Sequence, residues 1–356
     1  MGSRVITLKK KICRALVATT YAVLLGIIIY LSMMLFMPSF TLTSVLDGGK
    51  VHLLRTEIER PISSSSMSGN DNVSAETIKA SVNDTQFNVQ KAGLNMMGVP
   101  AAWNYVKSNK KITIAVIDTG CRYNLKDLKG NIDTELAYDI YNNCKLVNDP
   151  KVPNGDIAGH GTEVCSVISA VANNKYGIAG ISYNAKILPI KVADNTEDGD
   201  ASFYNLEKAY QYLFKLIDSG KLKNLAAINI SYGGTSNYSK LQAAINKMHN
   251  EYNVVTVAAA GNDGEPWEKA YAEYPSDMDN VLSVEAAGDD SCMAWYSSWN
   301  ENKDIAAFGD YIPVTCLTEK NDYDLISSTS FASPSVAAIV GLLKAYDPSL
   351  SADRIV

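Results

Sequence analysis

Apolar positions in the C-terminal three quarters of the chain fall into short uninterrupted runs separated by longer amphipathic stretches. The uninterrupted runs are KITIAVID, AKILPIKV, LAAINIS, NVVTVAAA and VLSVEAA. Runs of this length, rich in β-branched residues and free of polar interruptions, are typical of strands that are buried on both faces. We therefore predict core strands at these positions.

The stretches between these runs have helical periodicity instead. After His160, apolar residues recur at i, i+3, i+4 and i+7, and a similar spacing returns near 203–217 and 336–343, while YSKLQAAINKMH is a further helical stretch. Strands that alternate with helices favour a mainly parallel sheet covered on both faces. The predicted fold class is therefore α/β, a doubly wound sheet with helices on either side.

The N-terminal part has a different character. Residues 1–14 are basic, and residues 15–37 form an uncharged apolar run. Because about 20 apolar residues are enough to cross a bilayer, we expect 15–37 to be a transmembrane anchor with residues 1–14 in the cytoplasm. A cleaved signal peptide, which would give a secreted protein, remains the alternative, although its apolar core is usually about 7–15 residues long.

Between the anchor and the folded domain lies a polar, serine-rich segment. Residues 38–85 include PISSSSMSGNDNVS, whose composition suits a flexible tether or the remnant of a pro-segment. The folded domain is predicted over 86–356. The net charge of −6 and the pI near 5.2 give a nucleic-acid partner no electrostatic support.

Four polar motifs follow predicted strands or begin predicted helices. Asp118 ends KITIAVID, and Asn262 follows VVTVAAAG, while His160 lies in GHGT and Ser330 in SSTSFASPS. Each residue alone has an ordinary structural explanation, such as a helix cap or a turn. Sites in open α/β sheets form beyond the carboxyl ends of the strands, so together the four are candidates for one site.

The motifs VIDTG, GHGT, AAAGN and TSFASP occur in the order found in the subtilisin-like serine proteases (subtilases, peptidase S8), which this chain resembles from about residue 87 to its end. The resemblance implies that Ser330 is the nucleophile, that His160 is the general base and acid, and that Asp118 orients His160. It gives the oxyanion hole to the Asn262 side chain and the Ser330 N–H. Catalysis needs no cofactor. Residues 86–356 would then be the catalytic domain, with an apparently truncated C-terminus.

The same resemblance implies that substrate binds as an extended strand. Its first pocket would lie between Ser231, Tyr232 and Gly233 on one side and Ala260 and Gly261 on the other, with a second binding edge near 199–202. Tyr232 is expected to narrow or cap this pocket.

Several residues depart from the family pattern. Ser328 replaces the usual glycine before Thr329, Phe331 replaces a common methionine, and Glu163 replaces a common histidine. Asp263, which directly follows Asn262, would favour a basic substrate residue. Pro334 is expected to help build the helix start that presents Ser330.

The resemblance also implies a structural calcium site in ANNKYGI. The ligands would be the carbonyl oxygens of Ala172, Tyr176 and Ile178 and the side chains of Asn174 and Asp127. Such oxygen ligands suit a hard cation. An asparagine-rich turn without a metal is the alternative.

The combined prediction is a monomeric, membrane-tethered serine endopeptidase that acts on peptides or proteins outside the cytoplasm. A catalytically silent peptide-binding relative and a dedicated maturation protease for an exported peptide are the alternatives. The six cysteines do not fix a pairing, but Cys165 is predicted to pack in the core, and no cysteine occupies a motif position.

Overall fold

The computed structural model describes residues 82–106, 112–264, 272–317 and 323–356. The predicted anchor at 15–37, the basic residues 1–14 and nearly all of the tether lie outside these ranges. In the part of the chain that is described, no helix combines the length and apolarity needed to cross a membrane.

A mainly parallel sheet forms the centre of the domain. Among the described residues, eight strands lie in the order β3-β2-β4-β1-β5-β6-β7-β8, and only β3 runs antiparallel to its neighbour. The strands are β1 (Thr113–Asp118), β2 (Tyr138–Asp139), β3 (Cys144–Lys145), β4 (Lys186–Lys191), β5 (Leu225–Ile230), β6 (Val255–Ala259), β7 (Val281–Ala287) and β8 (Ile305–Phe308). The predicted strands are confirmed as β1 and β4 to β7. The remaining three, at the two edges of the sheet, were not predicted.

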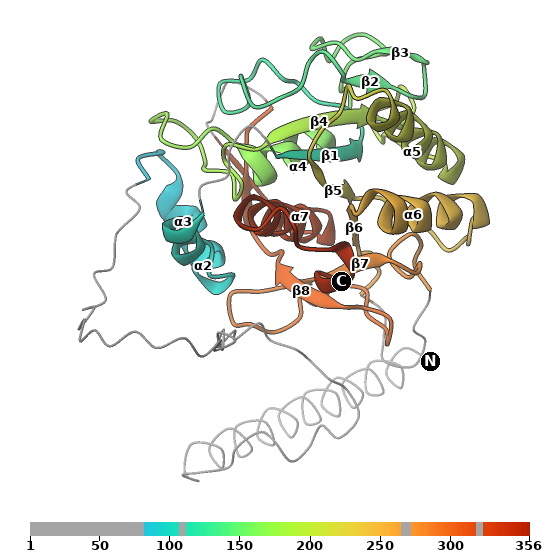
Figure 1. Ribbon diagram of the computed structural model, residues 1–356. Coiled ribbons are helices and arrows are strands. Elements are labelled where there is room, and N and C mark those ends of the chain that lie inside the picture. The colour runs from blue at the N-terminus through green and yellow to red at the C-terminus, as the bar shows by residue number, and fades with distance from the viewer. Residues whose placement is uncertain (1–81, 107–111, 265–271, 318–322) are drawn as a thin grey trace, which may run out of the picture. The chain divides into compact units, whose positions relative to one another are not determined.

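Helices cover both faces of this sheet (Figure 1). They are α2 (Phe87–Met96), α3 (Val99–Tyr105), α4 (His160–Ser169), α5 (Phe203–Asp218), α6 (Ser239–Tyr252) and α7 (Thr329–Tyr346), followed by a 3₁₀ turn, Ala352–Arg354. An antiparallel pair, β9 (Ile312–Val314) and β10 (Asp324–Ile326), precedes α7. The doubly wound α/β fold is thereby confirmed.

The alternation along β1 explains why its sequence is uninterruptedly apolar. Ile114 and Val116 pack in the core that includes α4 and α7, while Ala115 and Ile117 pack in the opposite core with α5 and α6. All four are fully buried. Burying such a side chain contributes about 1.5–3 kcal/mol for an isoleucine, so both layers stabilise the same strand.

The strand order brings the predicted motifs together. β1, β5 and β6 are direct neighbours, and their pairs Ile117–Ile230 and Ile230–Ala258 set the carboxyl ends at nearly the same level. Asp118 therefore ends its strand beside the residues that follow β5 and β6. His160 begins α4, and Ser330 lies in the first turn of α7.

Candidate active site

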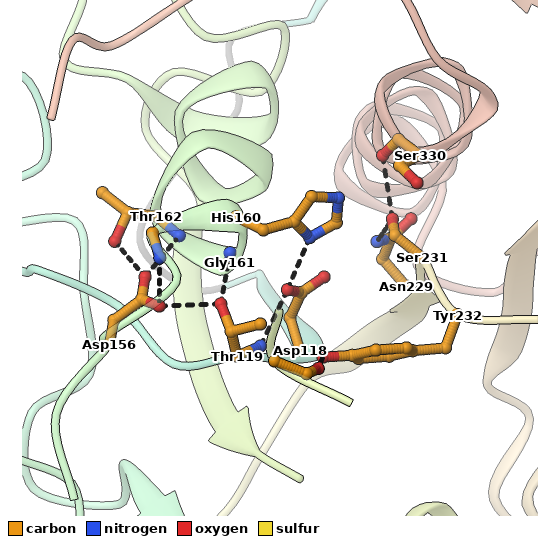
Figure 2. A network of polar contacts seen from close by, with 12 residues as sticks. Asp118, Thr119, Asp156, His160, Gly161, Thr162, Asn229, Ser231, Tyr232 and Ser330 are labelled. Carbon is orange, nitrogen blue, oxygen red and sulfur yellow. Dashed lines mark hydrogen bonds and ion pairs between the residues drawn. The ribbon is translucent and has the colours of Figure 1, made fainter. Parts of the chain in front are cut away.

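Asp118 and His160, 42 positions apart in sequence, are in direct contact. His160 Nδ1 lies 2.8 Å from Asp118 Oδ1, so a proton on Nδ1 donates to that carboxylate (Figure 2). The same oxygen accepts from the N–H of Thr119 at 2.7 Å. Asp118 is fully buried, whereas the His160 side chain is 31% exposed. The imidazole is thus held by Asp118 at Nδ1, while part of the ring is exposed to solvent.

A buried carboxylate, Asp156, fixes the start of α4. Its Oδ1 accepts from Thr119 Oγ1 at 2.7 Å and from the N–H of Gly159 at 2.9 Å. Its Oδ2 accepts from the N–H and the hydroxyl of Thr162. These contacts satisfy donors that the first helical turn leaves unpaired. Asp156 was not predicted from the sequence, because it lies three residues before the N-cap, Gly159, where a capping side chain is not expected.

Gly161 lets α4 approach the end of β1 closely. Its N–H donates to Thr119 Oγ1 at 2.8 Å. A Cβ at this position would lie 2.4 Å from the carbonyl oxygen of Gly120 and 3.1 Å from the Asp118 Cβ. Any side chain at 161 would push His160 away from Asp118, so the glycine of GHGT sets the distance between them.

Ser330 is held through its backbone. Its carbonyl oxygen accepts from Ser231 Oγ at 2.8 Å, and Ser231 Oγ in turn accepts from Asn229 Nδ2 at 3.0 Å. Pro334, four residues after Ser330, has no N–H to donate to this carbonyl, so the Ser231 hydroxyl replaces the missing helical bond. The expectation that Pro334 belongs to the helix start is wrong, because it lies inside α7.

The hydroxyl of Ser330 has no hydrogen bond to His160 in the described part of the chain. Figure 2 shows the imidazole with Nδ1 toward Asp118, while α7 with Ser330 lies beyond the ring. The ring also packs against Phe331, with centroids 5.4 Å apart. Hydrogen bonds between a nucleophile and its base are often long without substrate and shorten in the complex.

Asn262 follows β6 and faces the start of α7. Its Oδ1 accepts from the Thr329 N–H at 2.9 Å, which fixes the amide so that Nδ2 donates to Ser328 Oγ at 3.0 Å. The N–H of Ser330 donates to the same Ser328 oxygen at 3.1 Å. Both groups expected to stabilise an oxyanion therefore converge on one hydroxyl oxygen.

Electrostatics at the site centre on two groups of α4. Burial lowers the pKa of His160, but the nearby charges of Asp118, Glu163 and Asp156 outweigh it, so the pKa lies above the usual 6.5. Burial raises the pKa of Glu163 to about 7, and the charge of His160 opposes this shift. Glu163 thus titrates near neutrality, three residues from the imidazole.

Two of the residues predicted to bind substrate, Gly233 and Gly261, lie against Glu273, which was not predicted from the sequence. A Cβ placed on Gly233 would lie 2.2 Å from Glu273 Oε1, and one on Gly261 would lie 3.3 Å from Glu273 Cγ. Ala260 is buried and donates its N–H to Val284. No pattern in the sequence indicated Glu273, because it lies between two predicted strands.

Tyr232 is tied to the predicted second binding edge. Its hydroxyl donates to the Gly199 carbonyl oxygen at 2.7 Å, and burial raises its pKa strongly. Its phenol group is thus fixed at Gly199 (Figure 2). This contact joins the segment after β5 to the loop around 199.

The predicted calcium ligands lie close together. Asp127 Oδ1 accepts from Asn174 Nδ2 at 2.7 Å, and Asp127 Oδ2 accepts from the Ile178 N–H at 2.9 Å. Asn174 Oδ1 is buried and has no hydrogen-bond partner. A second carboxylate, Asp84, accepts from the N–H groups of Asn173 and Asn174 at 2.7 and 2.9 Å.

This arrangement fits a hard cation through its oxygen ligands. The amide oxygen of Asn174 has no hydrogen-bond partner and lies beside the buried carboxylate of Asp127. A cation bound there would be coordinated by this oxygen and so satisfy it. The site has few side-chain ligands: no group of three or more His, Cys, Asp or Glu residues suited to a metal occurs among the described residues. Backbone carbonyls of the 172–178 loop would have to supply the rest.

Comparison with known proteins gives the family of this chain. A family model described as the subtilase family matches residues 109–355. Thermitase from Thermoactinomyces vulgaris is 33% identical over 269 residues, which cover 76% of this chain and 87% of thermitase. The cell wall-associated protease of Bacillus subtilis is 32% identical over 255 residues, 71% of this chain but only 26% of that protein.

A solved structure is also similar. It comes from work on proteases of Pseudoalteromonas arctica, aligns with a TM-score of 0.64 and is 28% identical. The alignment covers 77% of this chain and 90% of that chain. The similarity thus extends over nearly the whole of the solved fold.

Proposed function

The chain belongs to the subtilase family and is a serine endopeptidase, and from that premise we propose that Asp118, His160 and Ser330 form its catalytic triad. The observation that carries the proposal is the contact of 2.8 Å between His160 and a fully buried Asp118. A buried carboxylate at Nδ1 selects the tautomer whose Nε2 is free to accept a proton. That free side of the ring is where α7 brings Ser330.

The reaction follows from these positions. Ser330 Oγ attacks the peptide carbonyl carbon while His160 Nε2 takes the hydroxyl proton. The charge that develops on the carbonyl oxygen is stabilised by Asn262 Nδ2 and the Ser330 N–H. His160 then gives its proton to the departing amine, which leaves an acyl-enzyme. Water, deprotonated by His160, releases the acid product, and Asp118 stabilises the imidazolium in both halves.

The substrate would bind in extended conformation. Its main chain would pair with Ser231–Gly233 on one side and with Ala260 and Gly261 on the other, so that the scissile carbonyl lies between Ser330 and Asn262. The hydroxyl of Ser231 donates to the Ser330 carbonyl oxygen, so this strand-binding segment is attached directly to the residue proposed as the nucleophile.

Membrane tethering completes the proposal. Residues 15–37 would anchor the protein with 1–14 inside, so that catalysis takes place outside the cytoplasm. After a carbonate wash, full-length protein should remain in the membrane fraction. Recovery of the catalytic domain in the medium, with an N-terminus between residues 38 and 50, would show that a signal peptide had been removed instead.

Covalent labelling tests the triad directly. A fluorophosphonate probe should label the wild-type protein at Ser330, and Ser330→Ala should abolish both labelling and peptide cleavage. Ser327→Ala is the matched control, since it removes a neighbouring hydroxyl that accepts from the Tyr311 N–H. A folded wild-type protein that binds peptides but is never labelled would be the catalytically silent relative.

A further inference from the structure

Glu273 lies against Gly233 and Gly261, the two glycines assigned to opposite sides of the first substrate pocket. Its Oε1 is so near Gly233 that a Cβ there would be 2.2 Å away, and its Cγ is 3.3 Å from a Cβ placed on Gly261. Glycine at 233 therefore leaves room for the carboxylate. The pocket assignment rests on the proposed function, which supplies these two walls.

Glu273 is largely buried, with 9% of its surface exposed. Its hydrogen bonds within the described ranges all involve its backbone, so none of them neutralises the carboxylate. Burial raises the pKa of Glu273, and the positive charge of Lys303 opposes this rise. However, Lys303 Nζ donates its hydrogen bonds to Asp277 Oδ1 at 2.6 Å and to Ser276 Oγ at 2.7 Å, and not to Glu273. An unpaired carboxylate is costly to bury, so the site is arranged for a positive group that arrives from outside.

A second carboxylate near Glu273, that of Asp263, also favours a cation at this site. Asp263, directly after Asn262, is close enough to raise the pKa of Glu273, an effect that adds to the larger one of burial. Two carboxylates that repel each other are both relieved by one cation that binds near them. An apolar or acidic substrate side chain would leave this repulsion in place.

We propose that Glu273 determines the specificity of this protease, and that the residue before the cleaved bond is arginine or lysine. The guanidinium of arginine can donate two parallel hydrogen bonds to the carboxylate, and the lysine ammonium can donate one. The chain would then be a processing enzyme for basic sites rather than a broad degrader.

The test compares peptides that differ only in the residue before the cleaved bond. Arginine, lysine, citrulline, leucine and glutamate are the informative members, because citrulline has the shape of arginine without its charge. We expect the full-length protein to cleave after arginine about 10²-fold more efficiently, as kcat/KM, than after citrulline. Glu273→Gln should remove most of this ratio, mainly by raising KM for the arginine peptide.

A matched control keeps the charge effect apart from general destabilisation. Glu285 on β7 is a half-buried glutamate away from this pocket, with a pKa raised by burial to about 7. Glu285→Gln should keep the preference for arginine over citrulline. Glu273→Lys should reverse the specificity toward glutamate, which a variant that merely unfolds cannot do.

Binding to an inactive protein separates this inference from the proposed function. In a Ser330→Ala background, calorimetry should show that a product peptide ending in arginine binds more tightly than one ending in leucine, and Glu273→Gln should abolish the difference. If wild type is labelled and cleaves peptides but arginine and citrulline are equal, the inference is wrong and the triad stands. If labelling fails but arginine binding still depends on Glu273, the triad is wrong and the pocket stands.

Discussion

The side-chain amide of Asn262 donates to the hydroxyl oxygen of Ser328 at 3.0 Å. The N–H of Ser330 donates to the same oxygen at 3.1 Å. In the proposed mechanism these two donors stabilise the oxyanion, so the Ser328 hydroxyl lies where the substrate carbonyl oxygen would have to bind. Subtilases usually have glycine here, which has no side chain to place in that position. A substrate must therefore displace the hydroxyl before the reaction can begin.

Replacing Ser328 with glycine should make the enzyme faster. The hydroxyl is tethered beside the two donors and is harder to displace than free water, so its loss should raise kcat/KM about tenfold. A cavity of about 390 Å³, lined in part by Ser328, Ser327 and Trp295, gives the wild-type hydroxyl space to rotate away. The measurement is kcat/KM on one peptide together with the rate of fluorophosphonate labelling.

The control is Ser327→Gly, which increases flexibility in the same loop without freeing either donor. Ser328 also caps α7 through the Ser330 N–H, so its loss should cost about 1 kcal/mol of stability, visible in thermal unfolding. If Ser328→Gly and Ser328→Ala both lowered kcat, the hydroxyl would be a donor to the oxyanion rather than an obstacle to it.

Asn262→Ala should lower kcat by about 10²–10³ with little change in KM. That magnitude comes from the loss of one such donor in a subtilisin, and therefore from a relative of this chain. The amide approaches the oxygen closely only when charge develops on it, so the loss belongs to the transition state. Steady-state kinetics on a single peptide check this, and a raised KM with kcat preserved would make Asn262 a binding residue instead.

A double-mutant cycle connects these two predictions. Once Asn262 is alanine, the Ser328 hydroxyl competes for one donor only. Ser328→Gly should then raise kcat/KM much less than it does in the wild-type background, because the effects of substitutions within one hydrogen-bond network are not additive. Equal gains in both backgrounds would show that Ser328 acts independently of Asn262.

The sequence predicted those features that depend on local pattern or on motif order. Val116 and Ile117 lie in a short apolar run rich in β-branched residues, which predicts a strand buried on both faces, and β1 is such a strand. Asp118 and His160 were predicted as partners because their motifs occur in family order, and they are in contact. Both the apolar run and the family motifs are local in the sequence, so they can be identified from a single sequence.

Features that depend on packing between distant segments were missed. Glu273 has no motif of its own, and only the closeness of Gly233 and Gly261 shows that its carboxylate lies between them. Pro334 was expected in the first turn of the helix, because the Ser231 bond that replaces its missing donor cannot be read from sequence. The short edge strand β8 lacks the uninterrupted apolar pattern, since two of its four residues are half-buried and one is exposed.

Calcium should stabilise the domain if Asp127 and Asn174 hold it. Chelation should lower the unfolding temperature, and added calcium should restore it by mass action, since an ion that binds only the folded state stabilises it. Asp127→Asn should remove the response to calcium. Thermal unfolding with and without chelator is the measurement.

Asp133→Asn is the control for this response, because the Asp133 carboxylate accepts from the N–H groups of Glu135 and Leu136 and lies outside the loop. That variant should keep the full calcium effect. Identical unfolding curves with chelator and with calcium in the wild-type protein would mean that residues 172–178 form a metal-free turn.

The pH profile should depend on Glu163. His160 can act as a base only when it is neutral, so kcat/KM should rise with pH through the pKa of His160, which lies above 6.5. Glu163 is one of the charges that raise this pKa, so Glu163→Gln should move the midpoint to lower pH by a few tenths to about one unit. Kinetics between pH 5 and 10 measure the shift, with Glu285→Gln as the variant expected to leave the midpoint in place.

The same substitution should change stability in a direction set by Glu163 itself. Its pKa is about 7 in the folded protein against an ordinary 4.5, so the folded state holds the proton more tightly. The contribution of this group to stability is therefore present below pH 4.5 and is lost as the pH rises through 7. Glutamine has no charge to bury. The stability of Glu163→Gln relative to wild type should therefore be higher at pH 8 than at pH 4. Thermal unfolding at the two pH values checks this, and an equal difference at both would mean that Glu163 carries no buried charge in the folded protein.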